Sequence, residues 1–243
     1  MNKYYGIIVS LIAGFSTLIG FFSIYIKGNR NKIISKTLAF SGGVMITLSL
    51  IDLIPSSILY LNTNYNLFIS IIYSIFFLFL GALISFVLDK LIDNKGLYKT
   101  GIISMIGIIL HNIPEGIATY ILSTMNLKLG IILSIGIILH NIPEGISISI
   151  PIYHSTNNKQ KAFFYTFISG ISEPIGGVLA MGFLYKYIDN NLIGILFSII
   201  SGLMLYIGYY EMIKTSRKYS NYTLFYSMIG SIFILIVEIL LKM

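Results

Sequence analysis

Eight apolar stretches, each close to the length that crosses a bilayer, follow one another along this chain of 243 residues. A helix needs about 20 apolar residues to span the hydrocarbon core, where only helices and closed barrels satisfy the backbone polar groups. Charged residues make up 10% of the chain, against roughly 25% in soluble domains. The sequence therefore predicts an all-α integral membrane protein, with residues 1–243 forming a single domain in the lipid bilayer. The stretches cover about residues 4–26, 37–60, 66–88, 101–125, 129–152, 162–185, 190–210 and 222–241.

The 16 lysines and arginines are distributed unevenly among the segments that connect these stretches. Numbering the connections alternately places 12 of the cations on one side and 4 on the other. Basic residues accumulate in cytoplasmic loops, so this bias predicts that both termini lie outside the cytoplasm. We interpret the net charge of +7 as an orientation signal rather than a nucleic-acid-binding surface, and expect no nucleic-acid partner.

The hexapeptide His-Asn-Ile-Pro-Glu-Gly occurs twice, at residues 111–116 and 140–145. The identity extends over residues 106–117 and 135–146, and the offset of 29 residues corresponds to about one spanning helix and a tight turn. Both copies lie inside apolar runs. An ionisable side chain at the bilayer centre costs roughly 2.5–3.5 kcal/mol on insertion scales and is kept there for a function.

Within each copy, His and Glu are four residues apart and share one helix face, while Asn points to the side. Imidazole, carboxylate and amide groups together suit a borderline divalent cation such as zinc, iron(II) or manganese. A single copy could equally be a buried His–Glu pair that only stabilises the fold. Two copies on consecutive antiparallel helices can face each other, so we expect a shared metal site. Its candidate ligands are His111, Asn112, Glu115, His140, Asn141 and Glu144.

Proline residues accompany the candidate carboxylates. Pro114 and Pro143 have no N–H group, so each helix is expected to bend there. In the sixth stretch Glu173 precedes Pro174 and is flanked by glycines. Because a charge and freed backbone groups at membrane depth need protein or water around them, we predict that Glu173 is a metal ligand or lies on an ion pathway.

A fainter repeat relates the second stretch to the seventh. Residues 43–54 align with 202–213, and in both a Met precedes an acidic residue by seven positions. The two stretches run in opposite directions through the membrane, as in the inverted repeats of transporters. The sequence therefore predicts that stretches one to three and six to eight are inverted halves around the fourth and fifth. Three residues of this repeat are candidates for an ion path: Met45, Asp52 and Glu211.

The doubled HNIPEG, the segment SGISEPIGG and the eight stretches together resemble the ZIP (Zrt/Irt-like) family of divalent metal transporters, in particular its short prokaryotic ZupT/GufA-like branch. The resemblance implies a binuclear site between the fourth, fifth and sixth helices, uptake into the cytoplasm and a homodimer. It places Glu115 and Glu144 as bridges between two ions and Glu173 as a ligand. Many relatives carry Gln or Asp in the fifth-helix pair, where this chain has His140 and Asn141.

The predicted function is transport of divalent transition-metal cations across the cytoplasmic membrane, with zinc as the main cargo and Fe²⁺, Mn²⁺, Co²⁺ and Cd²⁺ as further candidates.

Two alternative functions use the same ligands. One is an integral-membrane metalloenzyme in which paired ions activate water, although the motifs have no additional general base or nucleophile beside them. The other is a metal site with a purely structural role. An inverted repeat with a carboxylate-rich core favours the transporter, and we expect no enzymatic activity.

Overall fold

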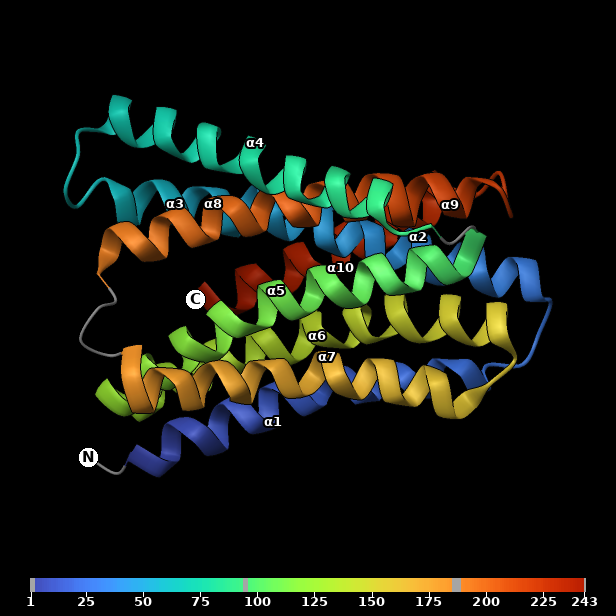
Figure 1. The fold of residues 1–243 in the computed structure, drawn as a ribbon, viewed down its shortest axis with the longest axis horizontal. Helices are drawn as coiled ribbons and strands as arrows, with labels where there is room; N and C mark the ends of the chain where they lie inside the picture. The colour runs from blue at the N-terminus through green and yellow to red at the C-terminus, as the bar shows by residue number, and fades with distance from the viewer. Residues whose placement is uncertain (1–2, 94–95, 185–188, 243) are drawn as a thin grey trace.

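The computed structural model describes residues 3–93, 96–184 and 189–242, and eight of its helical segments are long and apolar enough to cross a membrane. This agrees with the eight predicted spans (Figure 1). Three of the spans combine α-helix with a π-helical segment, and the first ends in a 3-10 turn. In chain order the elements are α1 (Lys3–Phe21), η1 (Phe22–Tyr25), α2 (Arg30–Leu48), η2 (Ser49–Leu53), α3 (Ile54–Leu61), α4 (Leu67–Leu91), α5 (Gly96–Met125), α6 (Leu127–Thr156), α7 (Lys159–Leu179), η3 (Ala180–Leu184), α8 (Asn190–Tyr206), η4 (Ile207–Ile213), α9 (Lys214–Arg217) and α10 (Thr223–Lys242).

Several helices begin where an Asn or Asp side chain caps the first turn. In each case the side-chain oxygen accepts a hydrogen bond from the backbone N–H three residues further on, which satisfies one of the N–H groups that a helix start leaves unpaired. The capping residues are Asn29 for α2, Asn66 for α4, Asn126 for α6, Asn158 for α7 and Asp189 for α8. These caps explain why some helices begin before the apolar stretch itself.

Two groups of helices make up the molecule. α1, α5, α6 and α7 pack against one another, while α4 packs on α8 and α10 packs on α2 (Figure 1). A large hydrophobic core joins the two groups through buried side chains such as Met45, Ile108, Ile150 and Met204. The helices that carry the doubled motif, α5 and α6, are therefore held from several sides.

The helix packing follows the predicted inverted repeat. The repeat exchanges spans one to three with six to eight, and the fourth span with the fifth. Under this exchange the helix pair α1–α6 corresponds to α7–α5, and the pair α4–α8 corresponds to α10–α2. All four pairs are in contact. The glycines agree with this exchange. A Cβ on Gly43 would overlap the carbonyl oxygen of Ser227, and one on Gly202 would overlap that of Leu78. Equivalent helix pairs thus approach equally closely, with glycine at the same place.

Regular α-helix is interrupted by π-helical segments in three of the spans, and one of them, η2, ends two residues before Pro55. α5 and α6 are assigned as continuous α-helix through Pro114 and Pro143, and the bends expected there stay a prediction. The π-helical segments lie in the second, sixth and seventh spans. Two of them, η2 and η4, correspond to each other in the repeat, and they contain Asp52 and Glu211 respectively.

α1 begins and α10 ends at the same end of the helix bundle, as eight crossings require (Figure 1). The connections at the opposite end are those that carry most of the lysines and arginines. Lys95 and Lys186, which belong to the charge count, lie outside the described residues. Together with the positive-inside rule, this arrangement supports the predicted orientation, with both termini outside the cytoplasm.

Candidate metal centre

The doubled motif brings two histidines and two glutamates together between α5 and α6. Nε2 of His111 lies 3.2 Å from Oε1 of Glu115 and 3.5 Å from Oε1 of Glu144. Nε2 of His140 also lies 3.2 Å from Oε1 of Glu115. All four side chains are buried, and one ligand atom from each of His111, His140 and Glu144 lies within 4.8 Å of the others. Separations of this size suit nitrogen and oxygen atoms that share one cation.

α7 adds a third carboxylate. Nδ2 of Asn141 donates a hydrogen bond to Oε2 of Glu173 at 2.8 Å, and it also donates to the carbonyl oxygen of Ala13 in α1 at 3.0 Å. Asn112 donates from Nδ2 to the carbonyl oxygen of Ser169 in α7 at 3.2 Å. Both asparagines thus present their N–H groups to protein, which leaves their Oδ1 atoms free to meet a cation. The structure brings all seven predicted ligands to one buried region.

Unpartnered polar atoms are concentrated in this region. Among the described residues, fourteen buried side-chain nitrogen and oxygen atoms have no hydrogen-bond partner, and ten of them belong to the seven predicted ligands. Three of the ten, the two histidine Nε2 atoms and Oε1 of Glu144, make only the ion-pair contacts described above. Each of the seven contributes at least one. A buried polar atom without a partner costs about 1–3 kcal/mol, so a concentration of them calls for a function or a bound group. Metal coordination would satisfy the oxygen atoms and one nitrogen of each imidazole, whose other nitrogen carries the N–H.

Glycines allow the neighbouring helices to approach the motif. A Cβ at Gly116 would overlap the carbonyl oxygen of Glu173, and a Cβ at Gly145 would overlap that of Thr17. The glycine that ends each HNIPEG copy therefore lets α7 pack directly on α5 and α1 directly on α6. Because Glu173 lies on the part of α7 that contacts Gly116, this close approach sets the position of its carboxylate.

The centre lies about halfway along its helices. His111 and Glu115 are the sixteenth and twentieth of the 30 residues of α5, and His140 and Glu144 are the fourteenth and eighteenth of the 30 of α6. At 1.5 Å per residue the centre is thus roughly 20 Å from either end of these helices. Protein rather than lipid surrounds the site, because 56% of the apolar window of both helices is buried.

The three predicted path residues lie outside this group. Asp52 is half-buried in η2, nine residues before the second span ends at Leu61. Glu211 is buried in η4, on the side of the basic connections. The Met45 side chain is buried in the hydrophobic core. Its backbone carbonyl accepts a hydrogen bond from the Ser49 hydroxyl at 2.8 Å. Met45 thus lies among apolar side chains, and its place on the ion path stays a prediction.

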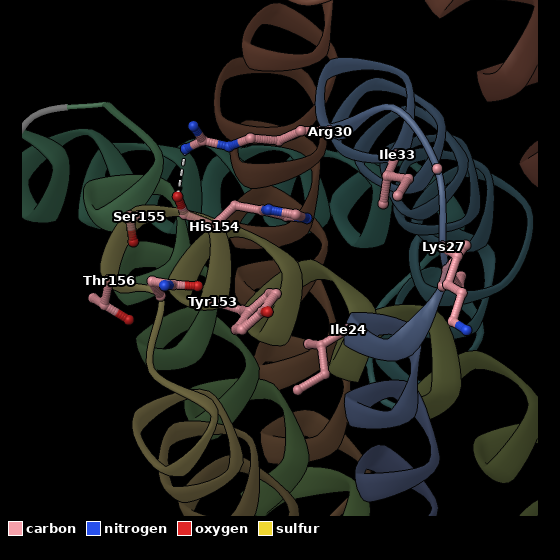
Figure 2. Close-up of a pocket in the computed structure, with 11 residues that line it drawn as sticks. Ile24, Lys27, Arg30, Ile33, Tyr153, His154, Ser155 and Thr156 are labelled. Carbon is pink, nitrogen blue, oxygen red and sulfur yellow. Dashed lines mark hydrogen bonds between the residues drawn. The ribbon is translucent and has the colours of Figure 1, made fainter.

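A solvent-facing cavity lies elsewhere, where the α1–α2 connection meets the end of α6 (Figure 2). Lys27, Arg30 and His154 line it, and Arg30 donates a hydrogen bond to the carbonyl oxygen of His154. His154 belongs to the last turns of α6 rather than to the loop in which the apolar stretches would place it. The two cations would repel a divalent metal ion, and none of the seven predicted ligands lines the cavity, so it is not part of the centre.

Four buried hydroxyls without partners were missed by the sequence argument: Thr17, Thr119, Ser123 and Ser169. Thr119 and Ser123 follow Glu115 at intervals of four residues, so they share its helix face. That spacing was readable in the sequence. A serine or threonine in an apolar helix often bonds its own backbone, however, and the sequence does not show which ones do.

Comparison with known proteins agrees with this arrangement. The family model described as "ZIP Zinc transporter" matches residues 93–238. The chain is 34% identical to the "Zinc transporter ZupT" of Campylobacter jejuni, over 90% of this chain and 89% of that protein. It is also 34% identical to the protein of the same name from Streptococcus mutans, over 96% of both chains, and 32% identical to that from Clostridium perfringens, over 99% and 96%.

The family match therefore spans more than half of the chain, and the relatives are similar over nearly their whole length. The matched region contains α5, α6 and α7, which together hold the buried histidines and carboxylates. Fold, site and similarity agree, and this chain belongs to the ZIP family of zinc transporters.

Proposed function

We propose that this protein transports divalent transition-metal cations, zinc foremost, across the cell membrane and into the cytoplasm. The relatives are named zinc transporters, and eight membrane-length helices suit a multi-pass membrane protein. The observation that carries the proposal is the concentration of ten buried polar atoms without a hydrogen bond on seven residues at the middle of the spans. Fe²⁺, Mn²⁺, Co²⁺ and Cd²⁺ present the same charge to these ligands and are further candidate cargoes.

Two cations would share the centre. We assign Glu115 as a bridge because its Oε1 lies 3.2 Å from both histidine Nε2 atoms. Glu144, which approaches His111 from α6, would be the second bridge. Together with Glu173 these residues supply three carboxylates against four positive charges, while the imidazoles and the Oδ1 atoms of both asparagines complete the coordination. This donor set replaces the water that an incoming ion loses.

Asp52 and Glu211 are the proposed entrance and exit of the ion path. Each is an acid within a π-helical segment, and the two segments correspond in the inverted repeat. Glu211 is near the basic end of the bundle, which the charge distribution assigns to the cytoplasm. Met45, the third residue predicted for this path, is buried in the hydrophobic core beside these spans and stays a candidate for the path.

Uptake of radioactive zinc into liposomes that contain the purified protein tests the proposal. Glu115→Gln keeps the shape of the side chain but removes the charge between the two histidines, so saturable uptake should be lost. Asp93→Asn, the same change at an exposed site in the α4–α5 connection, should leave uptake intact. Unlabelled Fe²⁺, Mn²⁺, Co²⁺ and Cd²⁺ as competitors would rank the cargoes.

Undiminished uptake by Glu115→Gln would refute the assignment of the centre. Wild-type protein that binds zinc tightly but moves none would refute transport, and would favour a metal-dependent membrane enzyme or a structural metal site.

We also propose that the protein forms a homodimer, a proposal that rests on the family resemblance alone. Native mass spectrometry of the protein released from lipid nanodiscs measures the number of chains directly. A single chain under conditions that preserve zinc binding would contradict the proposal.

A further inference from the structure

α1 repeats part of the α7 sequence that carries Glu173. Residues 14–21 read Gly-Phe-Ser-Thr-Leu-Ile-Gly-Phe, and residues 170–177 read Gly-Ile-Ser-Glu-Pro-Ile-Gly-Gly. Both glycines, the serine and the isoleucine coincide at an offset of 156 residues. At the position where α7 has Glu173, α1 has Thr17.

The contacts of the two helices follow the same correspondence. Asn141 in α6 donates to the carbonyl oxygen of Ala13 in α1, and Asn112 in α5 donates to that of Ser169 in α7, the residue 156 positions later. In the same way, the Thr17 carbonyl lies against Gly145 as the Glu173 carbonyl lies against Gly116. Thr17 is thus the structural counterpart of Glu173, on the other side of the inverted repeat.

The Thr17 hydroxyl is held without a partner. Its side chain is 0% exposed, and its Oγ1 has no hydrogen-bond partner among the described residues. The neighbouring Ser16 differs, because its hydroxyl donates to the carbonyl oxygen of Ala13 at 2.6 Å. Asn112 in α5 corresponds to Asn141 in α6, and its Oδ1 also lacks a hydrogen-bond partner. Oδ1 of Asn141 lacks a partner as well. The two halves thus differ in that Nδ2 of Asn141 also donates to Glu173, while the Thr17 hydroxyl at the equivalent position has no partner.

We infer that Thr17 is an eighth residue of the metal centre, and that its hydroxyl binds the hydration shell of a divalent cation on the side opposite Glu173. This inference rests on the proposed transport function. A threonine side chain is shorter than glutamate, so a water molecule bound to the ion spans the remaining distance. The two halves of the centre then differ in charge. The half with Glu173 holds its cation with an additional carboxylate, and the half with Thr17 holds its cation more weakly.

Metal titration of the full-length protein in detergent tests this inference, with isothermal calorimetry for Zn²⁺ and visible absorption for Co²⁺. Thr17→Val has nearly the same shape but no hydroxyl, and should weaken binding of one cation by about three- to tenfold, the range expected for one hydrogen bond. Thr17→Ser should bind as the wild type does. Ser16→Ala, which removes the adjacent hydroxyl that bonds its own helix, is the matched control and should also leave binding unchanged.

A second variant tests the equivalence with Glu173 independently. Thr17→Glu would place a fourth carboxylate at the corresponding position, and should tighten binding of the weaker cation. Wild-type binding curves for both Thr17→Val and Thr17→Glu would overturn the inference. If Glu115→Gln abolishes binding while these two variants behave as wild type, only the role of Thr17 fails. If Glu115→Gln also binds normally, the proposed centre itself fails.

Discussion

The ligand atoms of the centre show how far single residues determine its chemistry. His111 and His140 both direct Nε2 toward Glu115, and their ring centroids lie 6.0 Å apart. Imidazole nitrogen suits zinc and cobalt, whereas manganese is better suited by oxygen ligands. The second imidazole is therefore the group on which metal preference should depend most.

His140→Gln should change which metals compete for uptake. The substitution replaces an imidazole nitrogen with an amide, so we expect the apparent KM for zinc to rise about tenfold, as the loss of one orienting or ligating partner often does. Competition by Mn²⁺ should strengthen relative to Co²⁺. The measurement is zinc uptake into liposomes with increasing competitor. An unchanged order of competitors would show that His140 does not control selectivity.

The sequence predicted the histidines, asparagines and glutamates of the centre because such polar side chains are costly inside an apolar stretch and are kept there for a function. The sequence did not indicate that Thr17 belongs to the centre, although Thr17 lies within the first predicted stretch. The hydroxyls of Ser10 and Ser16 in the same helix donate to the backbone carbonyls of the residues three positions earlier, and only the structure shows that Thr17 does not. A hydroxyl becomes informative once its possible partners have been located.

At the scale of helices, the sequence predicted the number and order of the elements but placed several ends too far inward. α2 begins at Arg30 and α5 at Gly96, both before the apolar stretches that we identified. The additional helical turns carry charged and polar residues, so an assignment based on hydropathy places them in the connecting loops. The π-helical segments were also missed. None of the three contains a proline, and the sequence analysis did not use Pro55, two residues after η2, to predict an irregular helix.

Gly116→Ala tests whether close helix packing positions the centre. A Cβ there would meet the backbone of Glu173, which cannot move without shifting α7. We expect zinc uptake to fall by more than tenfold and the melting temperature to drop by several degrees, since overpacking typically costs about 1–3 kcal/mol. Gly182→Ala is the control, because a Cβ at Gly182 has no atom within 4 Å. Normal uptake by Gly116→Ala would show that the contact is not needed.

At the scale of the whole molecule, burial separates the helices into an inner and an outer set. Only 17% of the apolar window of α4 or α10 is buried, against 56% for α5 and α6. Large apolar side chains such as Phe68, Phe76 and Phe79 cover the exposed face of α4. The outer helices thus present the surface that lipid requires, and the motif helices are shielded from it.

The orientation of the molecule can be tested with single cysteines, because the chain has none of its own. Asn62→Cys lies in the α3–α4 connection and Asn221→Cys in the connection before α10, and both positions are exposed. In intact cells an impermeant maleimide should label the first and spare the second, because the charge bias places Asn221 in the cytoplasm. Labelling after lysis controls for accessibility. The reverse pattern would place both termini inside.

The depth of the centre has an electrical consequence. A cation that reaches a site halfway along α5 and α6 has crossed about half of the transmembrane voltage. Each elementary charge gains about 2.3 kcal/mol per 100 mV over the full membrane, so a divalent ion gains about the same amount over half of it when the cell interior is negative. The energised membrane thus draws ions toward the ligands from outside and resists their return, which gives a symmetric scaffold a preferred direction.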